Sequence, residues 1–191
     1  MGSTISVYLI ASAVSLAFED IVTNTHQPQL ASVGLPFIMV ELKNRMALEY
    51  ARFYMPAIEE IHSKGIMPDI LNYECSEDEF DIRARVFAPI DGVPEDPATG
   101  IANCALVAML SHYKTELKGD FSWRIAQGVE MKSPSVLDAR TKKSPDGIID
   151  LWIAGSCKMV SEGFIEVLMI DYLSNKLLMR TCNRARLGYF Q

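Results

Sequence analysis

The segment from Ile101 to Leu110 restricts the fold of this chain more than any other, because Asn103 is its only polar residue. A helix that is apolar on every side has no surface suited to water and must be enclosed by other parts of the protein. The segments that flank it have the patterns of β-strands. We therefore predict an α+β fold in which a curved mixed or antiparallel sheet wraps around a buried central helix.

Alternating polar and apolar residues predict most strands of this sheet. Residues 81–88 alternate ahead of Pro89, as expected of a half-buried strand, and residues 122–127 alternate likewise. Further strands are expected at 136–139, 148–154 and 159–169, with Trp123 and Trp152 as core residues. Ser144-Pro145-Asp146-Gly147 supplies a hairpin turn between two of these strands.

The first third of the chain is predicted to add short helices and one strand. Residues 5–18 have the composition of a core helix, and residues 32–40 that of a buried strand in which Pro36 implies an edge or a bulge. Asn44 can cap a helix over residues 45–51. A further helix is expected between Pro56 and Gly65, and its inward face would consist of Ala57, Ile58 and Ile61.

Composition and charge exclude several classes of function. The formal net charge of −6 disfavours a sequence-independent hold on nucleic acid phosphates. The four cysteines form no CxxC pair and no Cys/His cluster, so we expect no metal site, no disulfide framework and a cytoplasmic protein with reduced thiols. The apolar run at residues 7–16 is too short to cross a bilayer, and no basic residue precedes it, so no membrane association is predicted.

The turn Glu95-Asp96-Pro97-Ala98-Thr99-Gly100 leads directly into the apolar helix and is the sharpest candidate for a functional site. The first amides of a helix lack intrahelical partners and carry partial positive charge, and a glycine there lets a ligand approach closely. Such a helix end can hold a carboxylate or stabilise an enolate-like oxyanion. The alternative is that Asp96 or Thr99 simply caps a core helix, and spacing alone favours this alternative.

Three ordered motifs link the chain to a known family. Val93-Pro94-Glu95-Asp96-Pro97-Ala98-Thr99-Gly100 follows Arg85-Val86-Phe87-Ala88-Pro89, and two more segments agree, Ser32 to Phe37 and Gln127 to Met131 with Ser133-Pro134-Ser135. Together they resemble the signature of the PhzF-like (phenazine biosynthesis) isomerase family, from about Leu16 to about Glu166. The resemblance implies a diaminopimelate-epimerase-like fold of two similar lobes, each with a sheet curled around a central helix, and an active site between them.

The same resemblance implies cofactor-independent proton shuttling on a small carboxylate substrate. In this reading Asp96 is the catalytic residue of the chain and orients substrate or relays a proton. The amides of Gly100 and Ile101 would hold a carboxylate or enolate oxygen of the substrate. The remaining substrate-binding residues would be Glu95, Thr99 and Gln127, with no metal and no cofactor.

The departures from the family matter as much as the match. The family's general base, a glutamate, and an assisting histidine belong to an N-terminal lobe, whereas this chain resembles only the C-terminal lobe, over residues 1–170. The usual serine after Thr-Gly is replaced by Ile101, and the usual Gly-Arg before Pro-Ser is replaced by Lys132-Ser133. The sequence beyond Glu166 stops resembling the family, and residues 171–191 are predicted to form a divergent basic tail.

Two functions of different classes therefore follow from the sequence. In one, the chain is half of an isomerase, and a carboxylic base comes from a second polypeptide. In the other, it is a catalytically inactive binding or assembly module, or a truncated paralogue. Either way, a single lobe exposes the apolar face that normally meets its partner, so we expect a homodimer or a complex with an N-terminal lobe. Of the remaining candidates, Cys104 is expected in the core, His112 at the helix end, and His26 and His62 on the surface.

Overall fold

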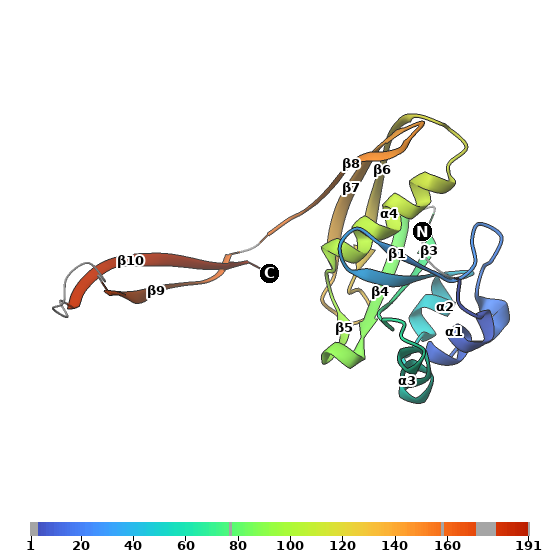
Figure 1. Cartoon of the computed structure of the whole chain (residues 1–191), viewed down its shortest axis with the longest axis horizontal. Coiled ribbons are helices and arrows are strands. Elements are labelled where there is room, and N and C mark those ends of the chain that lie inside the picture. Colours follow the sequence, from blue (N-terminus) through green and yellow to red (C-terminus); the bar gives the residue numbers. More distant parts are fainter. Residues whose placement is uncertain (1–3, 77, 158, 171–178, 191) are drawn as a thin grey trace. The chain divides into compact units, whose positions relative to one another are not determined.

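The computed structural model describes residues 4–76, 78–157, 159–170 and 179–190. The chain divides into two compact units, Met1–Gly155 and Ser156–Gln191 (Figure 1). Within the described residues no helix is both long and apolar enough to cross a membrane.

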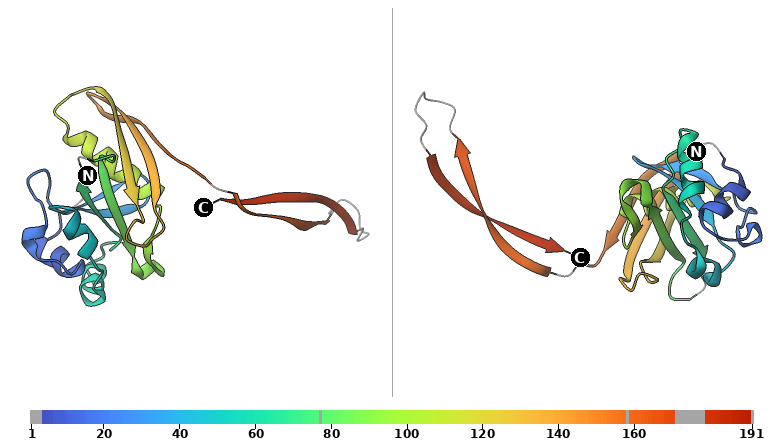
Figure 2. Two further views of the ribbon diagram at one scale, coloured as in Figure 1. Left: turned by 180° about the vertical axis from the view of Figure 1, so that it is seen from behind. Right: turned by 90° about the horizontal axis from the view of Figure 1, so that it is seen from below.

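A single curled sheet forms the first unit. Its strands in chain order are β1 (Gln29–Ser32), β2 (Pro36–Glu41), β3 (Ile70–Cys75), β4 (Ile82–Ala88), β5 (Val93–Asp96), β6 (Gly119–Gln127), β7 (Ser135–Ser144) and β8 (Gly147–Gly155). They are arranged as β1-β2-β3-β4-β6-β7-β8, with β5 paired to β4. The pairs β2–β3 and β4–β6 are parallel and the others antiparallel. The predicted α+β class with a curved mixed sheet is confirmed (Figure 2).

Helix α4 (Gly100–Tyr113) contains the apolar segment from Ile101 to Leu110. It packs against β1 and β2 on one side and β7 and β8 on the other, and Leu106 and Met109 are buried. The helix is not sealed all round, because Ile101, Cys104 and Ala108 remain partly exposed. These three lie at positions i, i+3 and i+7, so they form one half-open stripe along the helix.

Three further helices pack on the opposite face of the sheet: α1 (Val7–Ala13), α2 (Arg45–Tyr50) and α3 (Met55–Ser63) (Figure 1). Single 3₁₀ turns occur at Phe18–Asp20 and Pro89–Asp91. The predicted cap of α2 is confirmed, since the amide of Ala47 donates to Asn44 Oδ1 at 2.9 Å. The inward residues predicted for α3 are also buried. The predicted helix over residues 5–18 is too long, because α1 ends at Ala13.

Three strand predictions need correction. Residues 32–40 are not one strand: β1 ends at Ser32, the chain turns, and Pro36 starts β2 between two neighbouring strands rather than at an edge or a bulge. Strand β3 was not predicted at all. Strand β4 is buried on both faces rather than half-buried, because Arg83 and Arg85 lie under other parts of the chain. The strands β6, β7 and β8 and the turn at 144–147 agree with the prediction.

The second unit is an antiparallel hairpin of β9 (Met159–Ile170) and β10 (Met179–Phe190). Strand β9 matches the strand predicted at 159–169. Strand β10 falls within residues 171–191, which the sequence analysis assigned to a basic tail. Residues 171–178 and 191 of that segment lie outside the described residues. The boundary at residue 170 stays a prediction.

Candidate functional site

The turn between β5 and α4 is held by hydrogen bonds among its own side chains. Thr99 Oγ1 donates to Asp96 Oδ2 at 2.6 Å, and the amide of Ala98 approaches Asp96 Oδ1 at 3.4 Å. Neither side chain caps α4. Thr99 nevertheless occupies the N-cap position of α4, and its carbonyl accepts the first hydrogen bond of the helix.

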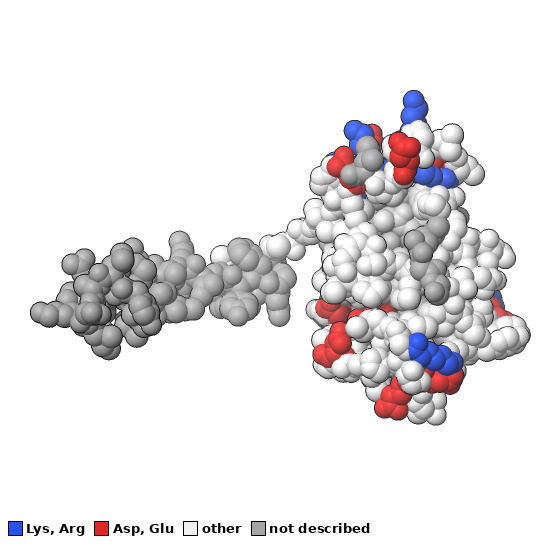
Figure 3. Space-filling model, viewed as in Figure 1, with Lys and Arg blue, Asp and Glu red and all other residues white. Residues whose placement is uncertain are grey.

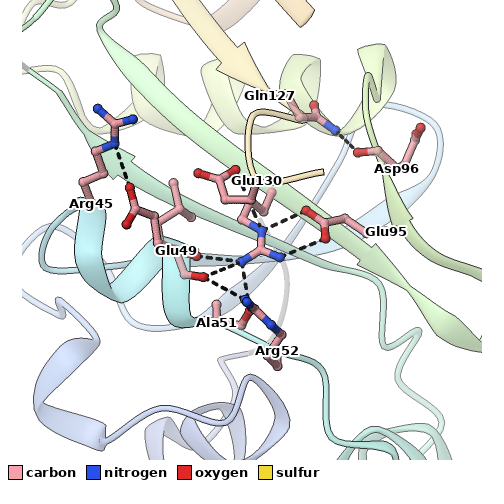
Figure 4. A network of polar contacts seen from close by, with 10 residues as sticks. Arg45, Glu49, Ala51, Arg52, Glu95, Asp96, Gln127 and Glu130 are labelled. Carbon is pink, nitrogen blue, oxygen red and sulfur yellow. Dashed lines mark hydrogen bonds and ion pairs between the residues drawn. The ribbon is translucent and has the colours of Figure 1, made fainter. Parts of the chain in front are cut away.

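Gln127 connects this turn to the end of β6. Its side-chain nitrogen donates to the carbonyl of Asp96 at 2.7 Å and to Thr99 Oγ1 at 3.0 Å (Figure 4). Its side-chain oxygen accepts from the amide of Thr99 at 3.2 Å and from Asn103 Nδ2 at 2.6 Å. Both ends of the Gln127 amide are thus engaged, and the buried residue acts as a brace for the turn.

The first turn of α4 presents free donors. The first intrahelical bond runs from the amide of Asn103 to the carbonyl of Thr99, at 3.1 Å. Among the described residues, none accepts a hydrogen bond from the amides of Gly100, Ile101 or Ala102. Gly100 and Ile101 are partly exposed, so a small anion can reach the positive end of the helix. In addition, the fully buried Oδ1 of Asn103 has no hydrogen-bond partner in the described part of the chain.

Two loops pack tightly around this helix end. A Cβ added at Gly34, in the β1–β2 turn, would lie 3.2 Å from a side-chain carbon of Ile101. A Cβ added at Gly128 would lie 2.8 Å from the carbonyl oxygen of Pro97 and closer still to that of Ser133. The three sequence motifs that carry the family resemblance therefore meet at the start of α4.

Glu95 points away from this group, as expected for neighbouring residues of a strand. Both of its carboxylate oxygens accept hydrogen bonds from Arg85, each at 2.8 Å (Figure 4). The structure thus brings Asp96, Thr99, Gly100, Ile101 and Gln127 together and directs Glu95 to the other face of β5. Sequence reasoning included Arg85 in a family motif but gave it no role, because the alternating pattern of β4 suggested an exposed side chain.

Several lesser candidates lie elsewhere than predicted. His26 is buried rather than on the surface, and its Nε2 lies 2.6 Å from the hydroxyl of Tyr73. Trp152 is 51% exposed, so its assignment to the core is wrong. Cys104 is half-buried, and burial raises the pKa of its thiol, which keeps it protonated. In the described ranges no three His, Cys, Asp or Glu side chains are grouped closely enough to hold a metal ion.

Comparison with known proteins identifies relatives of the first unit. Residues 4–163 match the family described as phenazine biosynthesis-like protein. The chain is 25% identical over 159 residues to an uncharacterized isomerase of Mesorhizobium japonicum, covering 81% of this chain and 53% of the relative. It is 29% identical over 136 residues to an uncharacterized isomerase of Deinococcus radiodurans, covering 70% of this chain and 44% of the relative. The chain thus spans about half the length of the curated relatives it matches.

Solved structures give the same result for the fold. The phenazine biosynthesis protein of the PhzF family from Bacillus anthracis superposes with a TM-score of 0.66 at 16% identity, covering 81% of this chain and 56% of that one. A predicted epimerase from Pseudomonas aeruginosa superposes with a TM-score of 0.58 at 25% identity, covering 81% and 52%.

Proposed function

This chain belongs to the phenazine biosynthesis-like protein family, and we propose that it supplies the substrate-holding half of a cofactor-independent isomerase that acts on a small carboxylate. Its curled sheet with α4 would be one lobe of a diaminopimelate-epimerase-like pair. The isomerase names of two relatives support the reaction class. The absence of a CxxC pair or Cys/His cluster supports a cytoplasmic setting.

The single observation that carries the proposal is the row of free amides at Gly100, Ile101 and Ala102. A carboxylate placed there would accept hydrogen bonds from groups that have no other acceptor in the described chain. An enolate formed by proton abstraction carries more charge on oxygen than the parent substrate, so the same donors would stabilise it more strongly.

Asp96 is the proposed catalytic residue because its partly exposed carboxylate borders this helix end and already shares the hydroxyl hydrogen of Thr99. In the proposal Asp96 orients the substrate or relays a proton, and Thr99 and Gln127 hold the turn in place around it. Glu95 contributes through its position, since both of its oxygens are engaged by Arg85. The general base is proposed to come from outside these 191 residues, from a second lobe.

The surface around α4 supports association with such a lobe or with a second copy of the chain. Leu35 is 58% exposed and Val33 42% exposed in the β1–β2 turn, next to the half-open stripe of Ile101, Cys104 and Ala108. In Figure 3 the charged side chains in view gather at the upper and lower ends of the first unit, and the described atoms between them are uncharged. Exposed apolar side chains such as Leu35 and Val33 support an interface when they form a contiguous patch.

Binding tests the proposal directly, with benzoate as the probe and benzamide as a neutral control of the same shape. We expect benzoate at millimolar concentration to shift the amide NMR signals of Gly100, Ile101 and Ala102, and benzamide to leave them unchanged. Asp96→Ala should weaken binding by releasing Thr99 from the turn. Absence of any benzoate-dependent shift at the three amides would refute the proposal.

Turnover provides the second test. A general base contributes roughly 10²–10⁴-fold to such reactions, so the purified chain should bind carboxylates without incorporating solvent deuterium into them. Incorporation by the chain alone, lost on Glu95→Gln, would instead make Glu95 the base.

One observation favours the rival function of a binding or assembly module. The hydroxyl of Thr99 and both ends of the Gln127 amide are already satisfied within the protein, which leaves few side-chain groups for catalysis.

A further inference from the structure

Arg85, on β4, forms more side-chain hydrogen bonds than any other described residue near the candidate site. It contacts the face of β5 that carries Glu95, opposite the face that carries Asp96. Its side chain is 4% exposed. Nε and Nη2 donate to the two carboxylate oxygens of Glu95, each at 2.8 Å. Nη1 donates to the carbonyls of Leu48 at 2.8 Å and Ala51 at 2.9 Å, with the carbonyl of Glu49 at 3.3 Å. One guanidinium therefore joins strand β5 to the end of helix α2 (Figure 4).

The carbonyls that Arg85 contacts lie at the C-terminal end of α2. The last carbonyls of a helix have no intrahelical partner, and this end carries partial negative charge that favours a cation. Burying a guanidinium is costly unless its hydrogens are paired. Here the cost is offset on two sides, by the carboxylate of Glu95 and by the end of α2. A third group, the carboxylate of Glu130 in the loop after β6, lies 4.0 Å from Nε.

These contacts hold the C-terminal end of β5 in place. Glu95 and Asp96 are consecutive, so a clamp on the Glu95 carboxylate also fixes the backbone from which the Asp96 carboxylate projects. The pairing of Asp96 with Val86, next to Arg85 on β4, holds the same point from the backbone. We propose that Arg85 is a positioning residue of the candidate site, which sets the location of Asp96 and of the turn before α4 through its fork on Glu95.

Lysine cannot replace Arg85 in this role. Two parallel N–H groups match the two oxygens of a carboxylate and fix its plane, whereas an ammonium is a point charge on a flexible stem. Arg85→Lys should therefore keep the charge but lose the planar fork and at least part of the contact with α2.

The chain provides a matched control on the same strand. Arg83 points to the same face as Arg85, is also buried, and donates from both Nε, at 3.2 Å, and Nη2, at 2.6 Å, to one carboxylate oxygen, Oδ2 of Asp78. Its partner precedes β4 and is distant in sequence from β5. Arg83→Lys therefore removes a buried guanidinium–carboxylate contact without touching the segment that carries Asp96.

The experiment compares Arg85→Lys with Arg83→Lys in the full chain. Two quantities are measured: the amide NMR signals of Asp96, Thr99 and Gly100 without ligand, and the affinity for benzoate. We expect Arg85→Lys to move the three signals and to weaken benzoate binding about tenfold or more, because the anion site depends on the position of the turn. Arg83→Lys should leave both quantities unchanged, even where it lowers the melting temperature by a similar amount.

The affinity measurement rests on the proposed function, whereas the ligand-free signals do not. If wild-type protein fails to bind benzoate, the proposed function fails, and the signals of Asp96 and Thr99 still test Arg85. Should Arg85→Lys not fold, Glu95→Gln tests the same fork, since it keeps the shape but sets an NH₂ group against the guanidinium. Unchanged signals and affinity in the folded variant, or equal changes in Arg83→Lys, would overturn the proposal.

Discussion

Asp69 lies just before β3 and is a buried carboxylate that forms no ion pair with any described residue. Asp69 is only 7% exposed, and its Oδ1 has no hydrogen-bond partner in the described part of the protein. Burial, with a smaller contribution from the charge of Asp91, raises the pKa of Asp69 to about 6. The folded state therefore favours the protonated form of this group. We predict that Asp69→Asn removes a pH-dependent loss of stability.

The sign and size of this effect follow from linkage. An acid whose pKa is higher in the folded than in the unfolded state stabilises the fold below the unfolded pKa, near 4, and this stabilisation is lost as pH rises through 6. The rise of about two units in the pKa of Asp69 corresponds to a change in unfolding free energy of roughly 3 kcal/mol, at 1.36 kcal/mol per unit, as an upper limit. Because Asp69 keeps some contact with water, we expect about 1–2 kcal/mol.

Urea unfolding of wild type and Asp69→Asn between pH 4 and pH 8 provides the assay. The difference in unfolding free energy should grow in favour of the variant by about 1–2 kcal/mol between pH 4 and pH 6.5 and then stay level. Reading the change with pH cancels any constant effect of the buried amide. Asp91→Asn is the control and should give a smaller change of the same sign. Parallel curves for wild type and Asp69→Asn would refute the reasoning.

Three further substitutions test the packing that surrounds the site. Gly128→Ala should cost at least about 2 kcal/mol more in urea unfolding than Gly65→Ala, because both glycines have φ of 75° but only Gly128 is crowded by other backbone; equal losses would contradict the close approach to Pro97. Tyr73→Phe should cost about 1–3 kcal/mol by removing the hydrogen-bond partner of Nε2 in the buried His26, and a neutral result would rule out that bond. Asn44→Ala should cost about 1 kcal/mol through loss of the α2 cap, whereas an unchanged midpoint would show that the cap adds nothing.

Local signals explain the parts of the fold that the sequence predicts well. The run of α4, in which Asn103 is the only polar residue from Ile101 to Leu110, predicts a largely buried helix, and the alternation in β6 reflects a sheet with one covered face. The Asn44 cap acts within four residues of its own position. Each of these features depends on neighbours in the chain and is therefore readable without knowledge of distant contacts.

Strand β3 could not be read in this way because its polar residues are buried with the apolar ones. Asn72 and Glu74 alternate with Leu71 and Tyr73, a pattern that resembles a half-exposed strand. In the structure the side chains of Asn72 and Glu74 are buried, and α2 packs against β3. Burial raises the pKa of Glu74, although the charge of Arg83 opposes this shift. Arg83 of β4 lies 4.0 Å from Oε1 of Glu74, whereas neither polar atom of the Asn72 side chain has a hydrogen-bond partner among the described residues. A sequence pattern reveals neither situation.

The candidate site shows the same division between local and distant information. The motif before α4 identifies the helix end and its amides, but not which donors remain free. Gln127, 28 residues further on, engages the amide and hydroxyl of Thr99. If an anion binds here as proposed, the backbone of Gly100 and Ile101 must provide the hydrogen bonds. Replacing the family's serine by isoleucine at position 101 removes a hydroxyl but keeps that amide. This chain should therefore retain the capacity to hold an anion even where it has lost side-chain groups that serve the chemistry.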